Sequence, residues 1–210
     1  MIYNNRQEAG QRLAEELLQY KGGENAVVLG LARGGVPVAF EVARSLGLPM
    51  DVFLVQKLGV PGHEELAFGA IASGGVRVLN EDVLSQLDIS HQEIEHITSK
   101  EKRELERREQ AYRGGKERVE LKGKVGILVD DGLATGASMR AAVTALRRHE
   151  PERIVVAVPT AAVETCAALE ALVDEMICAE TPSPFYGVGA WYKDFSQTTD
   201  DEVRALLGGA

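Results

Sequence analysis

The sequence predicts an α/β protein built on a doubly wound, mainly parallel sheet with helices on both faces. Apolar runs of strand length alternate with stretches in which apolar residues recur at helical spacing. Two of these runs end in polar, glycine-containing turns that open a helix, as βα units do. The chain has 210 residues and no internal repeat or low-complexity linker, so residues 1–210 are expected to form one domain with a sizeable core.

The elements can be assigned in order along the chain. Asn5 can cap a first helix, which Gly22 and Gly23 would close. Helices are also expected from residue 36 to Ser45, from the segment 135–138 to His149, and through Leu169. Because strands separated by helices pair in parallel through crossovers, a parallel sheet is expected, and 69–72 should be the strand that returns from the loop before it. These predicted strands are 26–31, 50–56, 69–73, 76–79, 125–129, 154–159 and 176–178.

The most informative segment is 125–138. Its β-branched apolar run is typical of a buried strand and ends at Asp130 and Asp131. Two adjacent carboxylates are costly to bury unpaired, so we expect them in a solvated crevice at the carboxyl edge of the sheet. The following helix offers unpaired N–H groups and the positive end of its dipole to an anion. The segment that would bind this anion is Ala134, Thr135, Gly136, Ala137 and Ser138.

A second turn has a similar character. The apolar run 26–31 is followed by Ala32-Arg33-Gly34-Gly35, and Val36-Pro37 then opens a helix. Such a turn exposes backbone amides beside a guanidinium, which can bind a phosphate in bidentate fashion. Both turns should lie at the same edge of the sheet.

The spacing Asp-Asp, three free positions, Thr-Gly, one free position and Ser resembles the phosphoribosyl pyrophosphate motif of the type I phosphoribosyltransferases. The resemblance implies that Asp130 and Asp131 hold the ribose 2′- and 3′-hydroxyls, while residues 134–138 hold the 5′-phosphate. It also implies that the turn 32–35 binds pyrophosphate, often through a strained peptide, here Ala32–Arg33. Ser138 stands where many members have Thr, and it keeps the hydroxyl. The resemblance covers roughly residues 26–178.

Lys57 follows the strand 50–56 and precedes a segment rich in Gly, Pro and charge, residues 58–68. This composition indicates a mobile connection of the kind that closes over a reacting centre. The family resemblance makes it the catalytic loop, with Lys57 near the departing pyrophosphate. His63 and Glu64 lie in this loop, where a lone His is more often solvated than catalytic.

A charged helical insertion is predicted at 90–115. It begins at a capping box formed by Ser90 and Glu93, and Glu104 and Arg108 form a favourable i,i+4 pair. One interpretation is a solvated helix flanking the sheet. The other is that basic and aromatic side chains of its last turns shape the substrate pocket or a subunit interface. These side chains are Arg107, Arg108, Tyr112 and Arg113.

The tail resembles the small hood that covers the acceptor base in this family. Residues 179–198 begin with Thr181-Pro182-Ser183-Pro184 and are rich in aromatic side chains. Aromatic faces stack on bases, and a nearby carboxylate can accept from a base N–H. The alternative is that these rings close the core at the carboxyl edge. The expected base pocket comprises Phe185, Tyr186, Trp191 and Asp194.

Composition bounds the remaining possibilities. A net charge of −9 argues against a general nucleic-acid surface. No apolar run is long enough for a membrane span and no signal peptide is evident, so a cytoplasmic protein without nucleic-acid or membrane partners is expected. Cys166 and Cys178 have no paired spacing and are expected to be buried free thiols.

The resemblance implies a Mg²⁺-dependent transfer of the phosphoribosyl group from phosphoribosyl pyrophosphate to a nitrogenous base, with release of pyrophosphate. Arg33, Lys57, Asp130 and Asp131 would carry the chemistry, and no side chain is assigned as a direct metal ligand. An alternative is a regulatory protein that senses phosphoribosyl pyrophosphate without turnover. An unrelated nucleotide-binding protein is disfavoured because the usual glycine-rich fingerprints are missing. A homodimer is expected from base rates alone.

Overall fold

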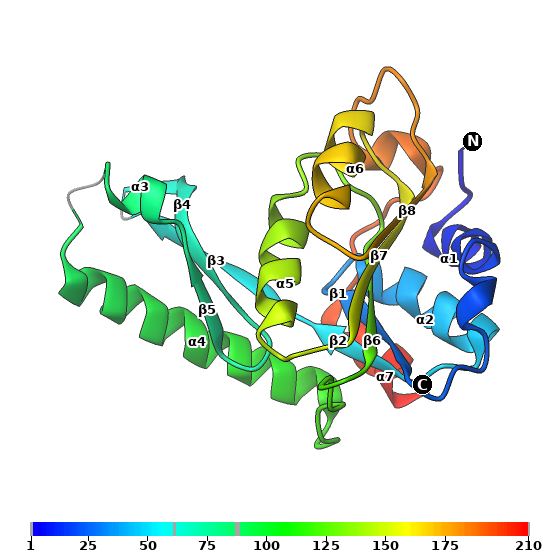
Figure 1. Cartoon of the computed structure of the whole chain (residues 1–210), viewed down its shortest axis with the longest axis horizontal. Coiled ribbons are helices and arrows are strands. Elements are labelled where there is room, and N and C mark those ends of the chain that lie inside the picture. Colours follow the sequence, from blue (N-terminus) through cyan, green and yellow to red (C-terminus); the bar gives the residue numbers. More distant parts are fainter. Residues whose placement is uncertain (1, 61, 87–88, 210) are drawn as a thin grey trace.

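The main sheet has five strands, and all neighbouring strands pair in parallel (Figure 1). The computed structural model describes residues 2–60, 62–86 and 89–209. The strand order is β2-β1-β6-β7-β8. The bounds are β1 Ala26–Leu31, β2 Met50–Phe53, β6 Val125–Val129, β7 Arg153–Thr160 and β8 Glu175–Glu180.

Helices cover both faces of this sheet. Figure 1 shows α1 (Arg6–Glu15) and α2 (Gly35–Leu46) on one side, with α5 (Ala137–Arg147) and α6 (Val163–Glu170) on the other. Strand β1 explains the arrangement, because its alternate side chains point to opposite faces. Val28 packs in the core under α2, whereas Val27 packs in the core under α5. The doubly wound α/β fold is therefore confirmed.

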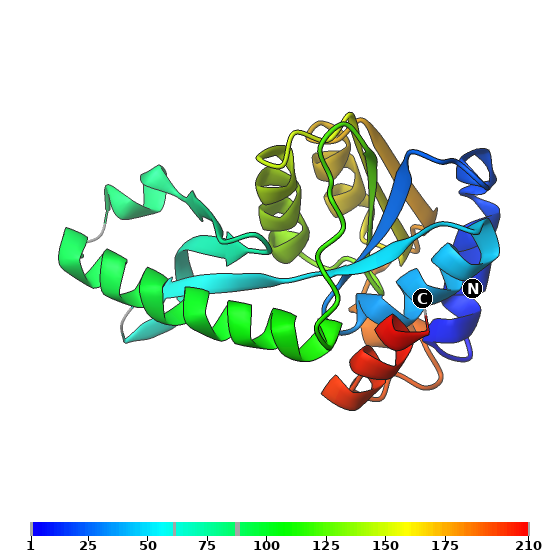
Figure 2. The ribbon, with the colours of Figure 1, turned by 90° about the horizontal axis from the view of Figure 1, so that it is seen from below.

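The second sheet is antiparallel, with order β3-β4-β5, and it projects away from the main sheet (Figures 1 and 2). We call this sheet and the two helices beside it the arm. Its strands are β3 Val55–Val60, β4 His63–Ala72 and β5 Val76–Leu79, and its helices are α3 Glu81–Leu84 and α4 His91–Arg113. The long helix α4 lies along β3 and β4 (Figure 2).

Two predictions for this region are wrong. The expected strand 50–56 is interrupted at Leu54, so that its second part leaves the main sheet. The expected mobile connection 58–68 instead forms most of the β3–β4 hairpin, with Val55 opposite Ala72. Burial explains the hairpin, since Leu58, Val60 and Phe68 join the core that α4 covers. Pro61 and the side chains of His63 and Glu64 lie outside what the structure describes.

Helix α4 starts and stops as its sequence predicts. The Ser90 hydroxyl accepts from the Glu93 N–H, and the Glu93 carboxylate accepts from the Ser90 N–H. Gly114 closes the helix at φ +57°, a conformation that glycine adopts without a steric penalty. The expected Glu104–Arg108 pair does not form. Arg107 bonds Glu104 with two nitrogens instead, because Arg108 is turned toward Gln56 and Tyr112.

Three short elements complete the chain. These are the 3-10 turns η1 (Leu18–Tyr20) and η2 (Val188–Trp191) and the C-terminal helix α7 (Asp200–Gly208). Helix α7 packs against α2 and α4, so the end of the chain joins the main body to the arm. No helix in the described part of the chain is long and apolar enough to cross a membrane.

The two cysteines are bonded to each other rather than free, which corrects the sequence prediction. Cys166 on α6 and Cys178 on β8 form a disulfide across a Cα–Cα distance of 6.7 Å. The pair forms because α6 packs directly on β8, the strand that follows it in the chain. That proximity is a property of the βα arrangement and leaves no mark in the spacing of the cysteines.

Candidate functional site

The structure brings the two predicted ligand-binding turns into direct contact. A Cβ built on Gly34 would overlap Oδ2 of Asp131, and one built on Gly35 would lie 2.5 Å from the carbonyl oxygen of Val129. Only glycine fits so close to these groups. The peptide between Ala32 and Arg33 is cis, at the position where the family resemblance expects a strained peptide. The turn 32–35 and the acidic pair Asp130 and Asp131 therefore lie side by side at one edge of the sheet, because β1 and β6 are neighbouring strands.

The two acids are half-buried and have perturbed pKa values. Burial, together with the negative charge of Asp131, raises the pKa of Asp130 well above its usual range. Burial also raises the pKa of Asp131, and the Arg6 guanidinium opposes that rise. Titratable groups with such shifts are more frequent at functional sites than elsewhere. Two neighbouring, half-buried carboxylates favour the binding of a ligand that has hydroxyl donors or brings a cation.

Arg6 is a member of the site that sequence analysis missed. Its Nε and Nη2 lie 2.9 and 2.8 Å from Oδ2 of Asp131, and the pair is largely buried. The guanidinium also lies 4.1 Å over the ring centre of Phe195 and donates to the Ser196 carbonyl. Arg6 is 125 positions from Asp131 on an ordinary amphipathic helix, so no local signal could have found it.

The predicted phosphate loop has the geometry of an anion site. Helix α5 begins at Ala137, with Gly136 as its N-cap at φ +69°. Its first N–H groups have no acceptor within the helix and can bind an anion, although that of Ala137 donates to the Thr135 hydroxyl at 3.5 Å in the free protein. The loop carbonyls are already used, since Thr135 O accepts from the Arg140 guanidinium and Gly136 O accepts from the Arg140 N–H. Thr135 and Ser138 are both exposed, and their hydroxyls can add donors.

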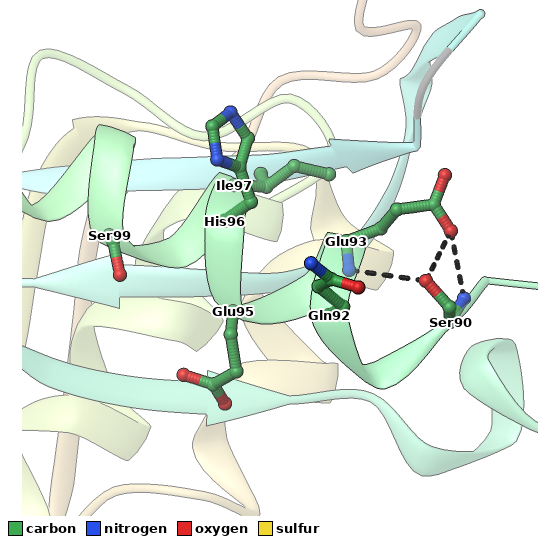
Figure 3. Close-up of a pocket in the computed structure, with 7 residues that line it drawn as sticks. All are labelled: Ser90, Gln92, Glu93, Glu95, His96, Ile97 and Ser99. Carbon is green, nitrogen blue, oxygen red and sulfur yellow. Dashed lines mark hydrogen bonds between the residues drawn. The ribbon is translucent and has the colours of Figure 1, made fainter.

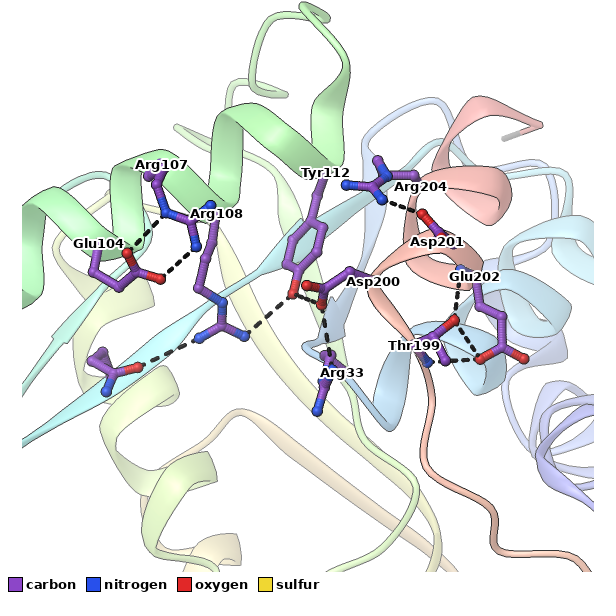
Figure 4. A network of polar contacts seen from close by, with 11 residues as sticks. Arg33, Glu104, Arg107, Arg108, Tyr112, Thr199, Asp200, Asp201, Glu202 and Arg204 are labelled. Carbon is purple, nitrogen blue, oxygen red and sulfur yellow. Dashed lines mark hydrogen bonds and ion pairs between the residues drawn. The ribbon is translucent and has the colours of Figure 1, made fainter.

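Arg33 lies in a chain of polar contacts that links three elements (Figure 4). Its Nη1 lies 3.4 Å from Oδ1 of Asp200, at the start of α7. The same oxygen accepts from the Tyr112 hydroxyl at 2.6 Å, and the Arg108 guanidinium lies 3.3 Å from that hydroxyl. The hydrogen bond from Tyr112 holds the pKa of Asp200 below its usual range. Arg108 and Tyr112 are thus connected to Arg33 through Asp200, and their part in a substrate pocket or a subunit interface stays a prediction.

We expect Asp200→Asn to strengthen the binding of pyrophosphate. The Asp200 carboxylate competes for Arg33 in the free protein and repels an incoming anion. The pair is largely exposed, so the gain should be modest, under about fivefold. Calorimetric titration with pyrophosphate measures it. Asp201→Asn is the matched control, because Asp201 pairs with Arg204 on the same helix. Weaker binding by Asp200→Asn alone would show that Asp200 orients Arg33 rather than competing for it.

The other two basic candidates on α4 do not reach the site. Arg107 is exposed and pairs with Glu104. Arg113 is buried and bonded to Asp51 at 3.0 Å, with Glu109 at 3.5 Å. The ion pair with Asp51 joins the end of α4 to β2. Arg113 also lines a cavity of about 460 Å³, which has none of Arg33, Lys57, Asp130 or Asp131 among its lining residues.

Lys57 lies on β3 and is exposed. It lines a cavity of about 490 Å³ between the arm and α5, together with Ala137 and Arg140. This cavity connects the predicted catalytic lysine with the phosphate loop, although no direct contact joins Lys57 to Asp130 or Arg33 in the described structure. A larger cavity of about 610 Å³ lies at the start of α4, beside Glu93, Glu95 and His96 (Figure 3). It has no member of the predicted site among its lining residues.

The aromatic tail closes one end of the site. Tyr192 is buried, donates to the Asp131 carbonyl at 2.6 Å and packs against Tyr3. Phe185 stacks with Trp191, whereas Tyr186 is 83% exposed. Tyr192 therefore helps to close the core at the carboxyl edge, as the second interpretation of the tail predicts.

Asp194 is exposed and accepts from the Ser196 N–H, which lowers its pKa. The predicted base-binding role of Phe185, Tyr186, Trp191 and Asp194 stays a prediction.

The residues at the edge fit a metal ion that is shared with a ligand. Mg²⁺ is usually held by one or two carboxylates together with substrate phosphates. Asp130 and Asp131 supply adjacent carboxylates next to the Arg33 turn. Within the described ranges, no group of three or more His, Cys, Asp or Glu side chains could hold a metal by itself. The two carboxylates thus fit a Mg²⁺ ion that also has ligands outside the protein, and binding of Mg²⁺ here stays a prediction.

Fold and edge together define an α/β protein of the phosphoribosyltransferase class. The chain belongs to the phosphoribosyl transferase domain family, which it matches over residues 1–67 and 61–189. It is 46% identical over 209 residues to "Putative phosphoribosyl transferase Rv0571c" of Mycobacterium tuberculosis strain H37Rv. That alignment covers 100% of this chain and 47% of the relative, so the chain spans about half the length of the curated relatives it matches.

Solved structures agree on the fold. The protein TT1426 from Thermus thermophilus is 43% identical, with a TM-score of 0.86, over 99% of this chain and 98% of that chain. A hypothetical protein from Neisseria gonorrhoeae with bound ppGpp is 13% identical, with a TM-score of 0.51, over 100% of this chain and 94% of the other. The second likeness is one of fold alone.

Proposed function

We propose that this domain transfers the phosphoribosyl group from phosphoribosyl pyrophosphate to a nitrogen of a heterocyclic base and releases pyrophosphate. The observation that carries the proposal is the contact of Gly34 and Gly35 with Asp131 and the end of β6. It puts a cationic, amide-rich turn, two carboxylates and a helix N-terminus along one edge. A diphosphate, a ribose ring and a 5′-phosphate occur in that same order in one molecule.

Each part of the edge has a chemical task in this reaction. Asp130 and Asp131 would accept hydrogen bonds from the ribose hydroxyls and orient the ring. Arg33 and the amides of Gly34 and Gly35 would stabilise the charge that develops on the leaving pyrophosphate. The phosphate loop would hold the other end of the sugar still, which lowers the entropic part of the barrier. Lys57 is proposed to approach the pyrophosphate from the arm.

Bound Mg²⁺ would neutralise part of the pyrophosphate charge and so help it to leave. Asp130 and Asp131 are the residues that would hold it, in company with oxygens of the substrate. A cytoplasmic location stays a prediction. The Cys166–Cys178 disulfide argues against it, since disulfides persist mainly in oxidising compartments.

The proposal is tested by measuring pyrophosphate release from phosphoribosyl pyrophosphate and Mg²⁺ in the presence of purine, pyrimidine and nicotinate-type bases. Release that depends on one of these bases supports a transferase and identifies its acceptor. Tight binding without release for any base would favour the regulatory alternative. The aromatic tail would set the acceptor, so Phe185→Ala should raise the KM for the base and leave that for phosphoribosyl pyrophosphate unchanged.

A further inference from the structure

Helix α6 lies directly behind the phosphate loop. The chain that leaves β6 and the chain that leaves β7 run side by side here, with Leu133 donating to Thr160 O and Ala162 donating to Leu133 O. Helix α6 starts one residue after Ala162. The position of α6 is therefore tied to the start of the loop by main-chain hydrogen bonds.

Thr165 makes two contacts with the loop from this helix. Its hydroxyl donates to the carbonyl oxygen of Ala134 at 2.5 Å. Its methyl group packs behind Gly136, where an added Cβ would lie 2.7 Å from Cγ2 of Thr165 and 3.3 Å from Cδ1 of Leu169. Thr165 is buried, and no motif in the sequence singles it out.

With the Thr165 hydroxyl, three successive carbonyl groups of the loop each have a hydrogen-bond donor from the protein. Those of Thr135 and Gly136 accept from Arg140, and that of Ala134 accepts from Thr165. Three successive carbonyl oxygens are thereby held against protein donors. An anion site requires this arrangement, because a carbonyl turned toward a phosphate would repel it while the N–H groups attract it.

A covalent bond holds α6 in this place. Cys166, the residue after Thr165, is bonded to Cys178 on β8. Both cysteines are half-buried, so a small reductant can reach them. Helix α6 has eight residues and no side-chain N-cap, so on its own it is a weak element.

We propose that Thr165 is a positioning residue of the phosphate loop, and that the Cys166–Cys178 disulfide keeps α6 where Thr165 can act. The inference rests on the proposed function only in assigning the loop to a 5′-phosphate. Reduction by a dithiol transfers two electrons and two protons, which gives two cysteine thiols and the oxidised, cyclic disulfide of the reductant. The reduced protein should then hold the loop less firmly and bind the phosphate more weakly.

The first test compares Thr165→Val with Thr165→Ser. Val keeps the shape and removes the hydroxyl, whereas Ser keeps the hydroxyl. Thr165→Val should raise the KM for phosphoribosyl pyrophosphate about tenfold with kcat nearly unchanged, since a partly buried hydrogen bond is lost and the Ala134 carbonyl is freed to turn toward the phosphate. Thr165→Ser should stay within about twofold of wild type. A loss in kcat alone, or equal effects of both variants, would contradict the positioning role.

Amide hydrogen exchange of residues 135–138 separates this inference from the proposed function, because it needs no ligand. Faster exchange in Thr165→Val but not in Thr165→Ser supports the positioning role even if phosphoribosyl pyrophosphate does not bind. Unchanged exchange in Thr165→Val overturns it, even if the wild-type protein turns over.

The second test concerns the disulfide. Treatment of the wild-type protein with dithiothreitol, or the substitution Cys178→Ser, should speed exchange in the loop and raise the KM in the same direction as Thr165→Val. In Thr165→Val, reduction should have little further effect, because residues that act as one unit are not additive. If reduction leaves the loop and the KM of the wild-type protein unchanged, the disulfide has no part in positioning.

Discussion

Changing Asp130 and Asp131 together to Asn should reduce transfer by about two orders of magnitude or more while the fold survives. Both carboxylates lie at the edge where the Gly34 turn meets β6, and Asn cannot accept in the same way or carry charge. The kcat/KM for phosphoribosyl pyrophosphate measures the loss, and circular dichroism checks the fold. Turnover at the wild-type rate in this double variant would refute the assignment of the site.

The single variant Asp130→Asn should make the free protein more stable near neutral pH. Burial and the charge of Asp131 raise the pKa of Asp130 in the folded state, so ionisation costs folding free energy once the pH exceeds the usual range of Asp. Stability due to this group is thus present at acid pH and lost as the pH rises through the raised value. Asn removes that loss, and a gain of about 1 kcal/mol would raise the Tm by about 2–4 °C.

Measuring the Tm gain of Asp130→Asn at acid pH as well provides the control for this prediction. The gain in Tm for Asp130→Asn should shrink as the pH falls toward the usual pKa of Asp, because both forms are then uncharged at this position. Asp131→Asn should show a smaller gain or none, because it also leaves the largely buried Arg6 guanidinium without its charged partner, which offsets the relief of the raised Asp131 pKa. An equal gain at every pH would show that the charge of Asp130 is not its cause.

Arg113→Met should destabilise the fold by about 3–5 kcal/mol, the usual cost of breaking a buried ion pair from one side. The Arg113 and Asp51 side chains are 8% and 7% exposed, and Glu109 is 5% exposed. Asp51 keeps two N–H donors, from Val52 and Val119, but loses the guanidinium that pairs with it. Urea unfolding followed by circular dichroism gives the free energy of unfolding.

Arg107→Met is the matched control for this variant. Arg107 lies on the same helix, has the same side chain and pairs with an exposed carboxylate, that of Glu104. Its removal should leave the unfolding midpoint unchanged, because exposed pairs contribute little. Equal destabilisation by the two variants would mean that general helix propensity, and not the buried charge cluster, determines the result.

The sequence could predict the main sheet because its strands are unbroken apolar runs. It could also predict that Asp130, Arg33 and the loop 134–138 lie at the same edge of the sheet. Each follows such a strand, and parallel strands end at one edge. The chemistry of these turns is local, and sheet order alone brings them together. In Figure 1, β1 and β6 lie side by side in the sheet, although they are far apart in the chain.

Other features depend on tertiary contacts and left no local pattern. Arg6 reaches Asp131 only because α1 packs beside the tail, and Thr165 reaches Ala134 only because α6 lies behind the loop. The cysteine pair depends on the same packing. The β3–β4 hairpin was indicated by the spacing of Leu58 and Val60, two apolar residues on one face of a strand. The neighbouring Gly and Pro residues favoured a loop instead, and the loop was predicted.

The central claim is that one edge of the sheet binds phosphoribosyl pyrophosphate through both turns. Calorimetric titration of the wild-type protein with phosphoribosyl pyrophosphate and Mg²⁺, beside the Asp130→Asn/Asp131→Asn variant, tests it most directly. We predict saturable binding with one site per chain that is strongly weakened in the variant. Absence of binding by the wild-type protein, or equal binding by both proteins, would contradict the account.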